Sequence, residues 1–403
     1  MSETSGQGAA APAVNPLLVL GALCFGRFCM GLQLQTVASL APFIMPDLGF
    51  GFGEIGLLIG LFLAPGVVLA IPGSIFAARF GHVRLGVTGV VLMAAGSLGL
   101  ALAEGFWGAV AARLIGGTGG ILLNISFLRL VALLFEGKAM NRAIGIVMSS
   151  WPVGLGLAAI TYPMLAELGG WRFPLWLVTG VTLCAAVCVA LLVREPKRRT
   201  EERSGAPLLG MDGRSWRLSL SLGAAFACFT AGGIVFLSFA PPFLQLSGLD
   251  IAAASAVTSL LVWLGLLGTP LGGWVADRLG SARGVIHFGA LGSALLVVLV
   301  VAGLPALPLT FLLGIVWGLP AAPFTGLLQR MLPSASLGTG YGVYFTLFYC
   351  GFFGFPAVAG WLIDITGDSA APLWFGALLL AVTSVLILLF YRLAATPADA
   401  SAR

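Results

Sequence analysis

Residues 71–81 read IPGSIFAARFG, and residues 270–280 read PLGGWVADRLG. The two stretches align without a gap, so that Arg79 corresponds to Arg278 and each stretch ends in glycine. Both follow long apolar runs, and both bring a basic residue to the end of such a run. The alignment indicates that the chain contains two related halves.

A second repeat and a polar linker support this division. PLWL at 174–177 recurs as PLWF at 372–375, at nearly the same separation as the first pair. The charged segment 194–217 (REPKRRTEERSGAPLLGMDGRSWR) lies between the two halves. We therefore expect one helical bundle over 16–193, a cytoplasmic linker over 194–217 and a second bundle over 218–392.

The composition places most of the chain in lipid. Of its residues 59% are apolar and 9% are charged, and the mean hydropathy is +1.06, whereas soluble domains carry roughly a quarter charged residues. All six cysteines fall in apolar runs, which argues against a disulfide framework. The net charge of +5 comes from basic residues in loops, so we expect a lipid-bilayer partner and no nucleic-acid partner.

Apolar windows of about 20 residues predict an all-α membrane protein with twelve transmembrane helices. Most Lys and Arg fall in the loops on the side of the chain ends, which predicts that both termini are cytoplasmic. Residues 1–15 and 393–403 are then cytoplasmic tails, the first of them disordered and without the features of a cleaved signal. To within several residues, the spans are 16–44, 54–77, 84–104, 107–128, 141–164, 174–193, 218–245, 253–276, 284–303, 306–328, 338–363 and 371–392.

The second repeated stretch continues to a further arginine and resembles a known loop. Gly273, Asp277, Arg278 and Gly280, followed by Arg283, are similar to the G-x-x-x-D-R-x-G signature of the major facilitator superfamily. The resemblance implies a fold of two pseudo-symmetric six-helix bundles, with a solute site between them and no cofactor. It also implies that the charged residues of this loop take part in gating.

The first-half copy of this loop departs from the signature. Ser74 replaces the glycine and Ala78 the aspartate, while Arg79 and Gly81 remain. The resemblance then implies that the second-half loop contributes more to gating. Further along, Arg113 opens an R-x-x-x-G-x-G pattern that is also similar to the family.

Two ionisable residues fall inside predicted spans, and both are arginines. Arg27 lies near the middle of the first span, and Arg113 lies in the fourth, whereas every acid falls in a loop, a tail or a span end. A buried guanidinium needs a counter-charge or several acceptors, and its forked donors suit carboxylates and oxyanions. We therefore expect a small anionic solute bound by Arg27. Arg113 either binds the same anion or has a structural role. A packing role for Arg27 also stays open.

Other polar and aromatic residues are candidates for the same cavity. Gly31 and Gln35 follow Arg27 on one helical stripe, with Gly31 expected to leave space beside the arginine. Asn124 lies on the same side of its helix as Arg113. Interhelical hydrogen bonding is an equal alternative for Gln35 and Asn124. The aromatic candidates, for which packing is the alternative, are Trp151, Trp263, Trp317, Tyr344 and Tyr349.

The coupling mode stays open. No acid or histidine lies deep in a span, since His82 and His287 sit at span ends. This favours anion exchange, uniport or proton coupling through the solute, and the chain is loosely similar to the cyanate and nitrate/nitrite permease branches.

The alternative function is export of a lipophilic solute. A polytopic membrane enzyme or sensor is disfavoured, because no metal-spaced or catalytic set is evident. We expect a monomer in a bacterial cytoplasmic (inner) membrane.

Overall fold

The structure is a computed structural model, which describes residues 15–69, 72–135, 137–195 and 211–395. The expectations for the N-terminal tail, for most of the linker and for most of the C-terminal tail lie outside these ranges. All regular structure within them is helical.

Twelve helical spans lie in the described part of the chain, which confirms the predicted number. The second and tenth spans are built from more than one helix. The helices are α1 (Pro16–Leu48), α2 (Phe52–Leu61), α3 (Pro65–Leu69), α4 (Pro72–Phe80), α5 (His82–Ala101), α6 (Phe106–Leu134), α7 (Gly137–Gly169), α8 (Arg172–Leu192), α9 (Gly213–Leu246), α10 (Ile251–Leu279), α11 (Ala282–Val301), α12 (Ala306–Gly318), α13 (Ala321–Met331), α14 (Leu337–Thr366) and α15 (Ala371–Ala395).

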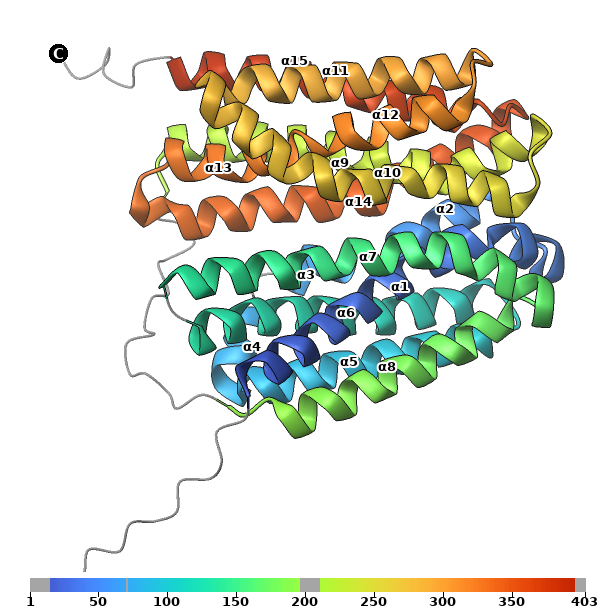
Figure 1. Ribbon diagram of the computed structural model, residues 1–403, viewed down its shortest axis with the longest axis horizontal. Helices are drawn as coiled ribbons and strands as arrows, with labels where there is room; N and C mark the ends of the chain where they lie inside the picture. Colours follow the sequence, from blue (N-terminus) through green and yellow to red (C-terminus); the bar gives the residue numbers. More distant parts are fainter. Residues whose placement is uncertain (1–14, 70–71, 136, 196–210, 396–403) are drawn as a thin grey trace, which may run out of the picture.

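The spans form two bundles that lie side by side (Figure 1). Helices α1–α8 make one bundle and α9–α15 the other. The repeated stretches end in equivalent geometry, because Gly81 and Gly280 both have a positive φ, of 96° and 62°. A side chain at either position would be strained, so the shared glycine has a structural reason.

Helix ends extend past several predicted boundaries because local caps, which hydropathy ignores, set them. The helix predicted from residue 218 begins at Gly213, where the Asp212 side chain accepts a hydrogen bond from the Ser215 amide at 3.3 Å. The first span continues to Leu48 and ends at Gly49 in the left-handed conformation.

Two of the spans are interrupted, and a proline lies at each break. The second span breaks after Leu61 and resumes at Pro65, and the tenth breaks between Gly318 and Ala321, with Pro320 before the new helix. Pro152, Pro163 and Pro270, by contrast, lie inside continuous helices. Proline removes a backbone donor, and whether the helix then breaks depends on what satisfies the freed carbonyls.

The two bundles meet at glycines. Gly56 and Gly60 of α2 lie directly against the carbonyl oxygens of Pro356 and Phe353 in α14. Across the other side of the interface, the Trp263 ring of α10 lies 2.8 Å from where a Cβ would stand on Gly156 of α7. These contacts all lie in the half of the molecule remote from the chain ends, here named the distal end; the opposite end is the terminal end.

Candidate functional site

Arg27 is buried about a third of the way along α1, counted from Pro16, with 4% of its surface exposed. Its Nη1 donates to the Asn124 Oδ1 of α6, and its Nη2 donates to the Met148 Sδ of α7 at 3.4 Å. The Nε–H is buried and has no partner. Since a thioether is a weak acceptor, the guanidinium has one strong partner among its donors and no counter-charge from a carboxylate in these contacts.

Tyr349 brings the second bundle to this arginine. It lies on α14 with 7% of its surface exposed, and its hydroxyl lies near the side chains of Asn124 and Arg27. Its ring lies against α3, where a Cβ on Gly66 would stand 2.7 Å from the ring. The Arg27 cluster, defined as Arg27, Asn124, Met148 and Tyr349, therefore brings side chains of both bundles together inside the spans.

Arg113 has a different environment. Its Nε donates to the Leu58 carbonyl at 2.8 Å, and its Nη1 donates to the Gln33 carbonyl at 2.8 Å and to the Thr36 hydroxyl at 3.2 Å. Its Nη2 completes the set with the carbonyls of Leu34 at 3.4 Å and Ile59 at 3.3 Å. All five N–H donors are thus used, and the Phe62 ring covers the guanidinium at 4.7 Å.

The break in the second span explains these acceptors. The amides of Phe62 and Leu63 both turn to the Gly60 carbonyl, which frees the carbonyls of Leu58 and Ile59 at the end of α2. Arg113 satisfies both and places its charge at the helix C-terminus, where the dipole favours a cation. Arg113 therefore has no free N–H donor for an anion in this conformation, so the structure does not support the expectation that Arg113 contacts the solute.

Gln35 lies apart from the Arg27 cluster. It lines a small cavity of about 20 Å³ with residues of α1, α7, α9 and α10, toward the distal end. The expectation that Gly31 leaves space beside Arg27 is wrong, because Gly31 packs directly on the Trp151 carbonyl of α7. Asn124 accepts a hydrogen bond from Arg27, a contact that the sequence did not predict; its predicted position on the same side of the helix as Arg113 stays a prediction.

The predicted aromatic residues divide into two groups. Trp317 stacks on Phe229 with 5.8 Å between ring centroids, and Tyr344 is fully buried and stacks on Phe226 at 4.9 Å, so both pack within the second bundle. Trp151 and Trp263 come from opposite bundles, and each has a buried indole N–H without a partner. Together with Tyr349 they remain the aromatic candidates for a solute site.

The predicted gating loop pairs within its own bundle. Asp277 and Arg330 form an exposed ion pair at 3.3 Å. Arg278 lies over the Trp274 ring and Arg283 over the Tyr391 ring, each at 5.4 Å. Gly273 lies close to α13, where its added Cβ would stand 3.4 Å from the Cβ of Ala322.

In the first bundle, Arg79 lies over the neighbouring Phe80 ring at 5.6 Å. The carboxylate that caps the following helix comes from Glu195, which accepts hydrogen bonds from the amides of His82 and Val83 at 2.7 and 2.8 Å. A carboxylate at a helix N-terminus satisfies free amides and suits the helix dipole. The first bundle thus has its own carboxylate at this end although Ala78 replaces the aspartate of the signature.

A carboxylate also joins the two bundles at the distal end, and sequence reasoning missed it. Asp364 of α14 accepts hydrogen bonds from the amides of Phe52 at 3.0 Å and Gly53 at 2.7 Å, at the start of α2. This contact, here named the distal latch, caps a helix of one bundle with a carboxylate of the other.

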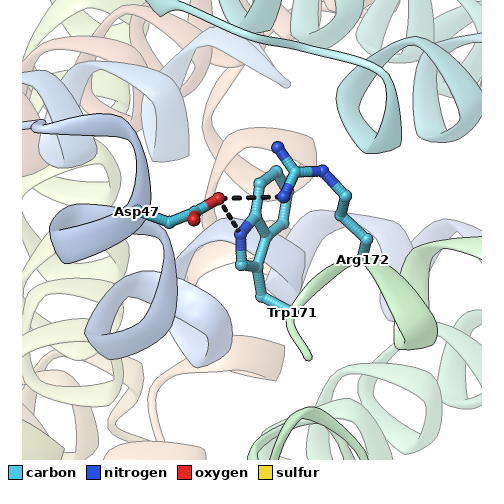
Figure 2. A network of polar contacts seen from close by, with 3 residues as sticks. All are labelled: Asp47, Trp171 and Arg172. Atoms are coloured by element: carbon cyan, nitrogen blue, oxygen red, sulfur yellow. Dashed lines mark hydrogen bonds and ion pairs between the residues drawn. The ribbon is translucent and has the colours of Figure 1, made fainter. Parts of the chain in front are cut away.

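A second distal network lies within the first bundle (Figure 2). Asp47 of α1 accepts hydrogen bonds from the Trp171 Nε1 and the Arg172 Nη1, both at 2.8 Å. The Arg172 guanidinium also lies 4.2 Å from the centre of the Trp171 ring. The network ties the end of α1 to the start of α8.

An open apolar groove of about 780 Å³ lies toward the terminal end between α1 and α7. Phe25 and Phe28 line it from α1, and Ile146 and Val153 from α7, with Arg142 at its rim. Within the described ranges, no group of three or more His, Cys, Asp or Glu side chains is placed to hold a metal ion.

Comparisons with known proteins agree with this architecture. The chain is 26% identical over 311 residues to the human protein named Protein spinster homolog 1, a match that covers 69% of this chain and 58% of the human protein. It is 25% identical over 393 residues to the hexuronate transporter of Bacillus subtilis strain 168, covering 90% of this chain and 91% of that protein.

A solved structure of a bacterial homolog of the human lysosomal transporter Spinster, described as inward-facing and occupied, has a TM-score of 0.72 to this chain. The two are 19% identical, and the match covers 96% of this chain and 97% of that chain. At this identity the likeness concerns the fold. The model of the Major Facilitator Superfamily matches residues 23–356 and again 220–403. With twelve spans in two bundles and a family match over most of its length, the chain belongs to the Major Facilitator Superfamily, a family of multi-pass membrane transporters.

Proposed function

We propose that this protein is a secondary active transporter that moves a small anionic solute, a carboxylate or an oxyanion, by alternating access. The observation that carries the proposal is the Arg27 cluster: a buried guanidinium with an unpartnered Nε–H, bordered by residues of both bundles. A cation held in the membrane without a carboxylate partner is an attractive site for an anion.

The arrangement of the bundles supports alternating access. The bundles are joined at the distal end by α2, α14 and the distal latch, while the predicted gating loop at the terminal end pairs within one bundle. A bound anion would contact Arg27 of the first bundle and Tyr349 of the second, so binding and relative bundle movement are coupled through one cluster.

The orientation follows from the charge pattern. The loops at the terminal end carry most of the Lys and Arg, and basic loops stay in the cytoplasm. Both termini and the 194–217 linker are then cytoplasmic in a bacterial inner membrane, and the conformation described here is closed at the periplasmic side. We expect a monomer that uses a coupling proton or an exchanged anion.

The hexuronate transporter similarity supports the anionic solute, since a hexuronate is a carboxylate. Arg113 does not enter the proposal as a solute contact, because its donors are occupied by backbone oxygens and Thr36.

A second candidate function rests on the groove between α1 and α7. Its lining of Phe25, Phe28, Ile146 and Val153 suits an apolar molecule, which favours export of a lipophilic solute. If this function is correct, binding of the lipophilic solute depends on these four side chains and is unchanged when Arg27 is replaced.

Thermal stabilisation of the purified protein separates the two functions. The panel contains small carboxylates and oxyanions, neutral sugars, amines and lipophilic cations, tested on the wild type, on Arg27→Ala and on Arg84→Ala, whose parent side chain is exposed. A ligand that binds the folded state raises the unfolding midpoint. We expect anions to stabilise the wild type and Arg84→Ala, but not Arg27→Ala. Stabilisation by lipophilic compounds alone, or by anions equally in all three proteins, would reject the anionic proposal.

A further inference from the structure

The charge of the solute can be inferred from the number of cations available to it. Arg27 and Arg113 are the arginines buried in the described spans. Arg113 directs all five donors at protein oxygens, so it has none for a ligand. One guanidinium, that of Arg27, is therefore left inside the spans with an N–H donor that has no partner.

The surroundings of Arg27 add no second charge. Within the described residues, the ionisable side chains that act on its guanidinium are Cys24 and Tyr349, and both types are neutral near pH 7 in their ordinary state. The nearest cations on the flanking helices lie toward the terminal end. Arg129 is five residues beyond Asn124, and Arg142 is six residues before Met148, which places them about 8–9 Å along the helix axes. Both side chains are exposed.

The donors and acceptors of the cluster match one anionic group. The Arg27 Nε–H has no partner, and the Nη2 donates only to the Met148 thioether. The Tyr349 hydroxyl lies nearby, next to Asn124. A carboxylate that accepts from the Nε and Nη2 would replace a weak thioether contact with two charge-assisted hydrogen bonds. A second carboxylate in the same space would have no cation to neutralise it.

Building on the proposed function, we infer that the protein selects solutes with a single negative charge and rejects matched dianions. The Arg27 guanidinium neutralises one carboxylate, and the neutral Asn124 and Tyr349 leave any further charge without a partner. We expect a monoanion to bind at least tenfold more tightly than a dianion of the same carbon skeleton.

Calorimetric titration of the purified full-length protein at fixed ionic strength tests this selectivity. Two matched pairs are used: galactonate against galactarate, and glycerate against tartronate. The decisive variant is Met148→Lys, which places an ammonium group beside the Arg27 Nη2, with Met148→Leu as its control. We expect the monoanion to bind more tightly in the wild type and in Met148→Leu, and the ratio to fall or invert in Met148→Lys.

The outcomes separate this inference from the proposed function. If dianions bind as tightly as monoanions and Arg27→Ala abolishes both, the charge inference is overturned while the anion transporter stands. If none of the anions binds, or binding is unchanged in Arg27→Ala, the proposed function fails and the inference fails with it. An unchanged ratio in Met148→Lys, with the folded protein confirmed by its thermal midpoint, would also overturn the inference.

Discussion

Replacing Arg113 by alanine should destabilise the protein rather than weaken solute binding specifically. The substitution removes five hydrogen bonds that join α6 to α1 and to the end of α2. Interhelical hydrogen bonds in membrane proteins contribute about 0.6 kcal/mol each, so the bonds together account for about 3 kcal/mol. The real loss should be no smaller, because the carbonyls of Leu58 and Ile59 stay buried at the break and lose this partner.

Titration with SDS gives the free energy of unfolding of the folded protein in mixed micelles. We expect Arg113→Ala to lose about 3 kcal/mol, and Arg113→Lys to lose part of this, because an ammonium cannot reach four separated carbonyls in one plane. Arg84→Ala should stay within about 0.5 kcal/mol of the wild type, since its side chain is exposed. If Arg113→Ala were as stable as this control and failed to bind the anions that the wild type binds, Arg113 would be a solute contact and the structural assignment would be refuted.

Three further substitutions test separate parts of the account. Asp364→Ala removes the distal latch, whose capping contact contributes about 1 kcal/mol at an exposed helix terminus. A cysteine placed at buried Ser39 should then react several-fold faster with a hydrophilic maleimide. An unchanged rate would show that the latch does not hold the distal end closed. Gly66→Ala places a Cβ 2.7 Å from the Tyr349 ring and should weaken anion binding, whereas Gly180→Ala, which meets no atom within 4 Å, should not; equal affinities in a titration would separate Tyr349 from the site. Asp47→Ala leaves the Trp171 indole without its acceptor and should lower the free energy of unfolding, measured by SDS titration, by about 1 kcal/mol. An unchanged free energy of unfolding would show that the network is only a surface contact.

The spans were predictable because each depends on a property that the sequence states directly. Twenty apolar residues in a row exclude a water-facing helix, and the repeated stretch around Arg79 and Arg278 identifies the duplication. The caps at Asp212 and Gly49 shifted the boundaries, since a cap depends on one side chain or one backbone angle rather than on average hydropathy.

The site was predictable only in part. Arg27 stood out because a charge in a span is rare, but the sequence gives no means to tell it from Arg113. The difference arises from the helix break before Pro65, which frees the carbonyls of Leu58 and Ile59 to accept hydrogen bonds from Arg113. A proline in a span does not by itself predict a break, because Pro152 and Pro270 lie in continuous helices.

Contacts between the bundles were the least accessible to sequence reasoning. The sequence predicts Tyr349 as an aromatic candidate, but its position next to Asn124 depends on how the bundles meet. Met148 and Asp364 gave no signal at all, because a methionine in a span and an acid at a span end are both ordinary. Which residues meet across the interface is a property of the assembled structure.

The most direct test of the central claim is counterflow in proteoliposomes. Vesicles that hold the purified protein are loaded with the unlabelled anion that stabilises it most, diluted into the labelled anion, and compared with vesicles that hold Arg27→Ala or no protein. Because counterflow is driven by the solute gradient and needs no ion gradient, it reports solute binding and bundle movement. We predict transient accumulation of label with the wild type and none above the protein-free level with Arg27→Ala. Equal accumulation in both proteins, or none with a folded wild type, would contradict an anion transporter built around Arg27.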